Sequence, residues 1–201
     1  MDASTLARPA FPPALEGARV RLRAHRDDDL DDLHAVHSDP AVMRFWSTPA
    51  WTDVDRTRER LAVAQAGNDP DAYLAWAIAD RDDDRLLGGV TVFRIDRAQG
   101  RAEVGYALRS SAWGRGHAQE ALRLALAYVF ALLALRRIEA DIDPRNLASC
   151  RLVERLGFVR EGLLRERWCV AGELQDTALY GLLARDFIDA PPASRPRTAL
   201  D

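Results

Sequence analysis

The stretch Trp113-Gly114-Arg115-Gly116-His117-Ala118-Gln119-Glu120-Ala121 decides how the chain is interpreted. Its two glycines stand at the start of a helical pattern over residues 115–134, which is apolar on all sides after Arg123 and therefore expected to be buried. Glycine lets the backbone approach a ligand closely, and the first N–H groups of a helix have no partner within it. Such a turn favours an anion, so we predict that it can hold a phosphate or diphosphate.

Alternating and helical patterns place this turn inside a mixed sheet with helices. Short polar turns join the expected strands 73–79, 86–95 and 101–108, which implies antiparallel hairpins. A strand–helix–strand pattern follows, with strands at 137–143 and 158–166, a helix at 146–156, and a last strand at 174–183 after a turn at Gly172. An earlier strand at 19–23 and helices at 27–37 and 53–66 complete a mixed α/β domain.

The chain has the length of one domain with tails. We expect residues 1–16 to be a loose N-terminal extension and residues 17–187 to form a single domain. Residues 188–201 contain three prolines among polar residues and are predicted to be a disordered tail.

Composition excludes several classes of function. The net charge is −3, which disfavours a dedicated nucleic-acid binder. All 28 basic residues are arginine, so the lysine required by a P-loop, a pyridoxal enzyme or a protein kinase is missing.

The cysteine content and the apolar segments predict a cytoplasmic protein without a membrane partner. Cys150 and Cys169 have no CxxC spacing, which fits a reducing compartment. Residues 1–16 have no apolar core of a signal peptide, and the longest apolar stretch, 124–135, is far shorter than the roughly 20 residues that span a bilayer.

The glycine turn alone leaves three interpretations open. A dinucleotide fingerprint requires a third glycine, but Gln119 stands there, and residues 109–112 form a loop where that fingerprint has a tight turn. Asp141 or Asp143 would then imitate the ribose-binding acid. A turn that binds no ligand is the second interpretation, and a coenzyme A site is the third.

The turn resembles the pyrophosphate loop Q/R-x-x-G-x-G/A of the GNAT superfamily of N-acetyltransferases. Gly116 and Ala118 match its last two positions, whereas Trp113 replaces the Gln or Arg. That replacement resembles the branch that acetylates the N-termini of ribosomal proteins, with W-G-x-G-x-A-x-E-A. Nearly all of residues 17–187 resembles this branch in order, through the segments 19–23, 39–45, 103–106, 146–149, 154–158 and 161–165.

The resemblance implies a GNAT fold: a mostly antiparallel sheet, flanked by helices, that splays between two parallel strands at 101–108 and 137–143. The pantetheine arm of acetyl-CoA would fill the gap. For three of the residues that the resemblance implies in binding acetyl-CoA there is an alternative: Asn146 can be a helix N-cap, and Arg115 and Arg151 can be solvated surface arginines. The residues implied in binding acetyl-CoA are Ala107, Leu108, Gly114, Arg115, Gly116, His117, Ala118, Gln119, Asn146 and Arg151.

The implied reaction is direct attack of an amine on the acetyl thioester. We take Glu103 as the candidate base, because strand alternation places it on one face with Gly105 and Ala107, whose small side chains leave room for a substrate. Ser149 matches a serine that relatives use to protonate the thiolate. The alternatives are an ion-paired strand glutamate and an ordinary serine in the first turn of a helix.

Aromatic residues are the candidates for the acceptor site. Trp46, Trp51 and Trp168 are expected to line it, and Tyr180 is a further candidate for substrate contact or proton transfer, with core packing the alternative for each. The first-choice acceptor is a protein or peptide N-terminal amine, and the second is a small amine. A silent CoA-sensing module is a third possibility. We expect a monomer or homodimer without a metal, because no ligand motif completes His25, His34 and His37.

Overall fold

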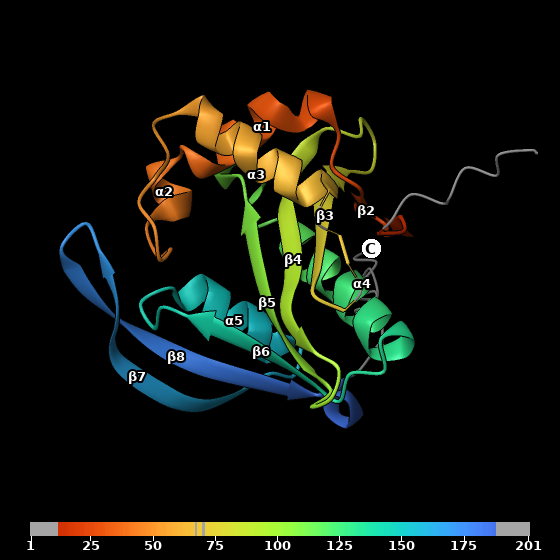
Figure 1. The fold of residues 1–201 in the computed structure, drawn as a ribbon, viewed down its shortest axis with the longest axis vertical. Coiled ribbons are helices and arrows are strands. Elements are labelled where there is room, and N and C mark those ends of the chain that lie inside the picture. Colours follow the sequence, from red (N-terminus) through yellow and green to blue (C-terminus); the bar gives the residue numbers. More distant parts are fainter. Residues whose placement is uncertain (1–11, 67, 70, 188–201) are drawn as a thin grey trace, which may run out of the picture.

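The computed structural model describes residues 12–187, except residues 67 and 70. Its strands form one mixed sheet in the order β1-β2-β3-β4-β5-β6-β8-β7 (Figure 1). Every neighbouring pair is antiparallel except β5 and β6, which run parallel as the family resemblance implies. The strands are β1 (Leu15–Glu16), β2 (Val20–Arg23), β3 (Tyr73–Asp80), β4 (Leu86–Asp96), β5 (Arg101–Leu108), β6 (Arg137–Ile142), β7 (Val159–Val170) and β8 (Glu173–Leu183).

Helices cover both faces of the sheet. Apolar side chains of α4 pack with Val90, Val104 and Leu108 in the larger core cluster. Side chains of α1 and α3 pack with Ala77 and Ala107 in a second cluster on the opposite face. The helices are α1 (Leu30–His37), α2 (Pro40–Met43), α3 (Val54–Ala66), α4 (His117–Leu132) and α5 (Leu147–Arg155), with 3₁₀ turns at Asp27–Asp29, Ser110–Ala112 and Ala184–Asp186.

The predicted elements are all present, and two short ones were missed. β1 pairs with β2 and lies within the segment 1–16, so the described end of that segment belongs to the sheet rather than to a loose extension. Asp39 caps α2 by accepting a hydrogen bond from the Ala41 amide at 2.8 Å. β7 runs to Val170, four residues beyond its predicted end. The predicted tail, residues 188–201, lies outside the described residues.

The sheet opens between β5 and β6. These strands pair only at Arg101 with Arg137, Ala102 with Ile138, and Glu103 with Glu139. Beyond this point β5 continues to Leu108 beside β4, whereas β6 continues beside β8. Figure 1 shows β6, β8 and β7 turning away from β5 as a separate wing. The fold therefore has the splay that the family resemblance implies.

Among the described residues, no helix combines the length and the apolar character that crossing a membrane requires.

Candidate functional site

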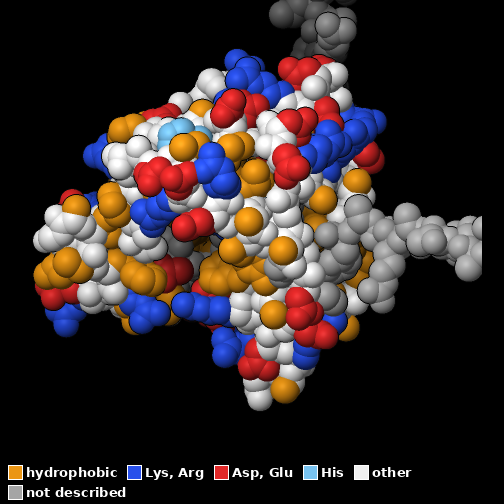
Figure 2. Space-filling model, turned by 45° about the horizontal axis from the view of Figure 1, so that its top comes forward, with side chains coloured by type: hydrophobic (Ala, Val, Ile, Leu, Met, Phe, Trp, Pro, Cys, Tyr) orange, Lys and Arg blue, Asp and Glu red, His pale blue; other side chains and the backbone are white. Residues whose placement is uncertain are grey.

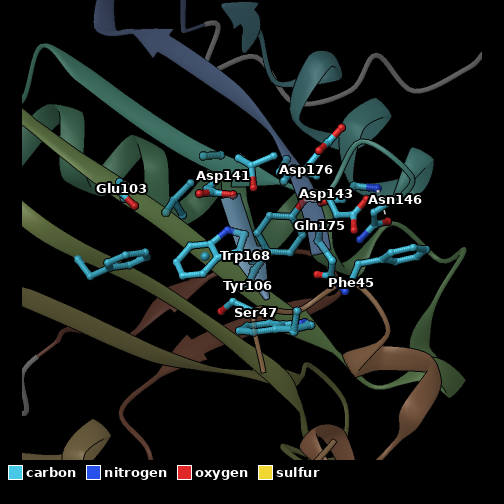
Figure 3. A pocket seen from close by; sticks show the side chains of 18 of the residues that line it. Phe45, Ser47, Glu103, Tyr106, Asp141, Asp143, Asn146, Trp168, Gln175 and Asp176 are labelled. Carbon is cyan, nitrogen blue, oxygen red and sulfur yellow. Dashed lines mark hydrogen bonds between the residues drawn. The ribbon is translucent and has the colours of Figure 1, made fainter. Parts of the chain in front are cut away.

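The splay between β5 and β6 contains a cavity of about 340 Å³. Figure 3 shows side chains from β5, β6, β7 and β8 around it, together with residues 45–47 that follow α2. Polar and acidic groups alternate with aromatic rings, so the cavity is suited to an amine held beside apolar surfaces. Its lining includes Phe45, Trp46, Glu103, Tyr106, Asp141, Asp143, Asn146, Ser149, Trp168, Gln175, Asp176 and Thr177.

The glycine turn before α4 presents main-chain N–H groups. Gly114 has φ 74° and Gly116 has φ 83°, which is left-handed backbone that glycine adopts readily. The helical hydrogen bonds begin with the Glu120 amide, which donates to the Gly116 carbonyl at 3.1 Å, and no side chain caps the helix at Gly116. The preceding amides of His117, Ala118 and Gln119 thus have no partner within the helix. The arrangement can bind an anionic group.

Trp113 has a structural explanation for replacing the Gln or Arg of the motif. Its indole N–H donates to the carbonyl of Leu108 at 2.8 Å, and its side chain is half exposed. This bond ties the glycine turn to the end of β5, the strand that borders the splay. Ala107 and Leu108 are both buried there, and Arg115 is exposed.

Asn146 precedes α5, and Arg151 lies within the helix. The Asn146 side-chain oxygen accepts a hydrogen bond from the Ser149 amide at 3.1 Å, which makes Asn146 the N-cap, and the same residue lines the cavity. Both roles considered for Asn146 are therefore compatible. Arg151 is exposed and does not line the cavity.

Glu103 lies in the cavity at the last paired position of β5 and β6. Both of its carboxylate oxygens accept from Nη1 of Arg94, at 2.8 and 3.0 Å, and its side chain is only 16% exposed. These hydrogen bonds raise the pKa of the Arg94 guanidinium. Glu103 is thus both ion-paired and positioned to face a substrate. Asp141 on β6 also lines the cavity, and its charge contributes to the raised pKa of Arg94, although its side chain forms no hydrogen bond or close ion pair among the described residues.

Ser149 is hydrogen-bonded across the splay. Its hydroxyl lies 2.5 Å from the hydroxyl of Tyr106, which joins the first turn of α5 to β5. Burial raises the pKa of Tyr106 to about 12, so the phenol is neutral at physiological pH. The pair is therefore neutral before the reaction and holds a hydroxyl proton that it can donate toward the cavity.

The aromatic candidates divide into two groups. Trp46 and Trp168 line the cavity. Trp51 is 8% exposed and stacks on His37 with 4.3 Å between ring centroids. Tyr180 is 2% exposed, and its hydroxyl donates to Glu154 at 3.1 Å. The structure places Trp51 and Tyr180 in the packed interior, outside this cavity.

A second cavity, of about 410 Å³, lies between the sheet and the helices α1 and α3. It shares Trp46, Phe93, Arg94, Gly105 and Tyr106 with the first cavity. Figure 2 shows arginine and acidic side chains lying next to one another over one face of the molecule. The remaining lining is His25, Leu33, His37, Arg60, Ala64, Ala72, Tyr73, Gly89, Thr91 and Ala107.

Comparison with known proteins identifies the family. The family model described as Acetyltransferase (GNAT) domain matches residues 19–159, about 70% of the chain.

The chain belongs to the GNAT family.

Its relatives support this membership over most of the chain. The Bacillus licheniformis protein named "Uncharacterized N-acetyltransferase p20" is 34% identical over 169 residues, 84% of this chain and 95% of that protein. The Bacillus subtilis "Putative ribosomal N-acetyltransferase YdaF" is 31% identical over 105 residues, 52% of this chain and 57% of that protein. A crystal structure of Vibrio cholerae spermidine N-acetyltransferase with CoA and spermine superposes with a TM-score of 0.74 and 25% identity, covering 86% of this chain and 98% of that one.

This protein is therefore an N-acetyltransferase, which transfers the acetyl group of acetyl-CoA to an amine. The dinucleotide interpretation of the glycine turn is set aside by this family membership. Among the described residues, no group of three or more His, Cys, Asp or Glu side chains is placed to hold a metal ion, and the absence of a metal stays a prediction.

Three residues of the site were not singled out from the sequence. Tyr106 belongs to the sequence prediction only as part of the family motif and Asp141 only as a possible ribose ligand, and no sequence pattern points to Arg94. The position of Asp141 could have been predicted, because Glu139 pairs with Glu103 and alternation places Asp141 on the same face of the sheet. The position of Arg94 could not have been predicted. It has φ 51° at an irregularity in the β4–β5 pairing, and the alternation of a regular strand does not anticipate such an irregularity.

His25 gives a testable pH dependence of stability. Burial, with smaller contributions from Arg60, Arg23 and His37 against the opposing charge of Asp29, lowers its pKa from 6.5 to about 4. Between these values the unfolded chain takes up a proton that the folded chain does not. We expect the free energy of unfolding to fall by about 3 kcal/mol as the pH drops from 6.5 to 4, and to lose little more to this group at lower pH.

The variant His25→Gln tests this expectation. Urea unfolding at pH 7, 6, 5 and 4 should give a smaller loss of stability for the variant than for the wild type over this range. Parallel curves for the two proteins would show that His25 titrates normally in the folded state.

Proposed function

We propose that the acceptor is the α-amine at the N-terminus of a protein or peptide, as in the ribosomal-protein branch that the sequence resembles. The observation that carries the proposal is the pairing of Glu103 with Arg94. A carboxylate is a weak general base, and the ion pair with Arg94 holds this one in place at the cavity. Such a base suits an amine that loses its proton easily.

The cost of deprotonation separates the classes of acceptor. An α-amine with a pKa of about 7.8 costs about 1 kcal/mol to deprotonate at pH 7, whereas an alkyl amine with a pKa of about 10.4 costs about 4.6 kcal/mol. The difference of about 3.5 kcal/mol corresponds to a several-hundredfold difference in the reactive fraction. A weak base acting directly or through one water is sufficient for the first acceptor only.

In the proposed mechanism, the amides of His117, Ala118 and Gln119 bind the diphosphate of acetyl-CoA, and the pantetheine enters the splay. The neutral amine attacks the thioester carbonyl, which forms the N–C bond and breaks the C–S bond. Glu103 receives the proton released by the amine. Ser149 donates its hydroxyl proton to the leaving sulfur and receives one from Tyr106, to which it is already hydrogen-bonded. Exchange with solvent then returns a proton to Tyr106 and removes the one taken up by Glu103, which restores both groups for the next turnover.

A polyamine is the second candidate acceptor, and two observations favour it. The Vibrio cholerae relative named for spermidine acetylation has a similar structure. Asp141 adds to the cavity a second carboxylate, beside Glu103, and such a group attracts any ammonium.

Acetylation of matched acceptors decides between these candidates. With saturating acetyl-CoA at pH 7, thiol release should give a kcat/KM at least about tenfold higher for the tripeptide Ser-Ala-Ala-amide than for spermidine, and its pH profile should level off above about pH 8. Higher activity with spermidine, rising past pH 9, would reject the α-amine as acceptor. An N-acetylated Ser-Ala-Ala-amide serves as the control without an amine.

A further inference from the structure

We infer that the second cavity selects acceptors that carry a carboxylate near the reactive amine, and that Arg60 is the residue that binds this carboxylate. The inference rests on the proposed function, because it assumes that the amine lies beside Glu103. It assigns the acceptor class: an N-terminus with an acidic side chain in its first two residues.

The second cavity is a continuation of the site on the face that carries Glu103. Register pairs Phe93 with Glu103, Thr91 with Gly105 and Gly89 with Ala107. Paired residues share a face of the sheet, so the glycines and the alanine form a floor beyond Glu103, with the Phe93 ring lying against Gly105 and the His25 ring near Gly89. A substrate whose amine reaches Glu103 can place its next atoms over this floor.

Arg60 is a cation without an acidic partner in this cavity. Its guanidinium bonds to the hydroxyl of Tyr73 and, at 3.3 Å, to the hydroxyl of Thr91, and it lies 5.7 Å from the centre of the Tyr73 ring. Within the described ranges, no carboxylate lies within 4.0 Å of it. By contrast, Arg58 on the same helix pairs with Asp55. The guanidinium is half-buried, held in place by neutral groups, and retains capacity for an anion.

Among the described residues, no acidic side chain lines the second cavity beside Arg60. The charge of Arg60 contributes to the lowered pKa values of both His25 and His37, where burial is the largest cause, so the two rings are neutral at pH 7. Arg94, the other cation of the cavity, is already paired with Glu103. An ammonium would be repelled here, which disfavours the distal amines of a polyamine.

The spacing fits a short acidic acceptor. Thr91 lies beside Gly105, which is two residues from Glu103 along β5. Two residues of a strand span roughly 7 Å, so the Arg60 guanidinium lies several bonds from an amine at Glu103. An aspartate or glutamate side chain at position one or two of a peptide covers this span.

The test measures a preference between two matched peptides with the full chain. Thiol release is compared for Ala-Glu-Ala-amide and Ala-Gln-Ala-amide at pH 7 and low salt. The expected result is a kcat/KM at least about tenfold higher for the glutamate peptide, decreasing as salt is added. Equal values for the two peptides, and for the pair Asp-Ala-Ala-amide and Asn-Ala-Ala-amide, would overturn the inference and leave α-amine acetylation standing.

Variants then assign the preference to Arg60. Arg60→Gln should reduce the kcat/KM ratio of the glutamate peptide to the glutamine peptide to about two or less. Arg60→Lys should restore part of this ratio, and the control Arg58→Gln should retain it. A ratio that survives in a folded Arg60→Gln protein would overturn the role of Arg60. If spermidine is acetylated but no peptide is, the proposed function is wrong and the inference falls with it. This result is distinguishable from equal acetylation of the matched peptides, which overturns the inference alone.

Discussion

Replacing Gly116 by valine should weaken the binding of acetyl-CoA at least about a hundredfold. Gly116 has φ 83°, a conformation that a β-branched residue adopts only as a rare outlier. The variant must rotate this peptide and thereby redirect the first amides of α4. Losing two charge-assisted hydrogen bonds costs about 3–6 kcal/mol, which corresponds to a factor of a hundred or more. Isothermal titration with acetyl-CoA measures the effect.

The matched control is Gly172→Val. Gly172 has φ 87° in the turn between β7 and β8, and a Cβ there would meet nothing within 4 Å. This variant should suffer a similar backbone strain of about 1–2 kcal/mol but bind acetyl-CoA as the wild type does. If both variants bind equally well, the diphosphate is not held by the turn before α4.

Changing Glu103 to glutamine should lower kcat for an α-amine about a hundredfold, with acetyl-CoA affinity within about twofold of the wild type. The amide keeps the shape of the side chain but cannot take up the proton of the amine, and general-base catalysis contributes roughly 10²–10⁴ in rate. The deficit should shrink at pH 9, where an amine of pKa about 7.8 is already neutral. Thiol release under saturating acetyl-CoA, followed across pH 6–9, measures both effects.

Glu139→Gln is the control for Glu103. Glu139 is the register partner of Glu103 on β6, pairs with Arg137 at 2.7 Å and does not line either cavity. Its replacement should leave turnover near the wild-type value. Unchanged turnover in Glu103→Gln would remove Glu103 from the mechanism and direct attention to Asp141.

Most of the fold was predictable because periodicity and turns specify it locally. The hairpin β4–β5, the buried helix α4 and the parallel pair β5–β6 all follow from sequence patterns and the family resemblance. β1 escaped detection because two residues cannot display an alternation. α2 carried a readable signal, an aspartate cap followed by proline at the first helical position, that was not used.

The site was predictable in part. The expected floor of small residues beside Glu103 corresponds to an open cavity, and Ser149 and Asn146 do meet at the start of α5. The contact of Tyr106 with Ser149 joins residues 43 positions apart, and only the packing of α5 against the splay specifies it. Trp51 and Tyr180 show the converse, because an aromatic residue in an apolar pattern gives no sign of whether it faces a cavity or the core.

A crystal structure with coenzyme A tests the central claim most directly. The account predicts diphosphate oxygens within about 3 Å of the main-chain nitrogens of His117, Ala118 and Gln119, and the pantetheine between β5 and β6 with its sulfur beside Ser149. A diphosphate bound elsewhere would contradict the account. So would coenzyme A that lies outside the splay while the Tyr106–Ser149 hydrogen bond persists across it.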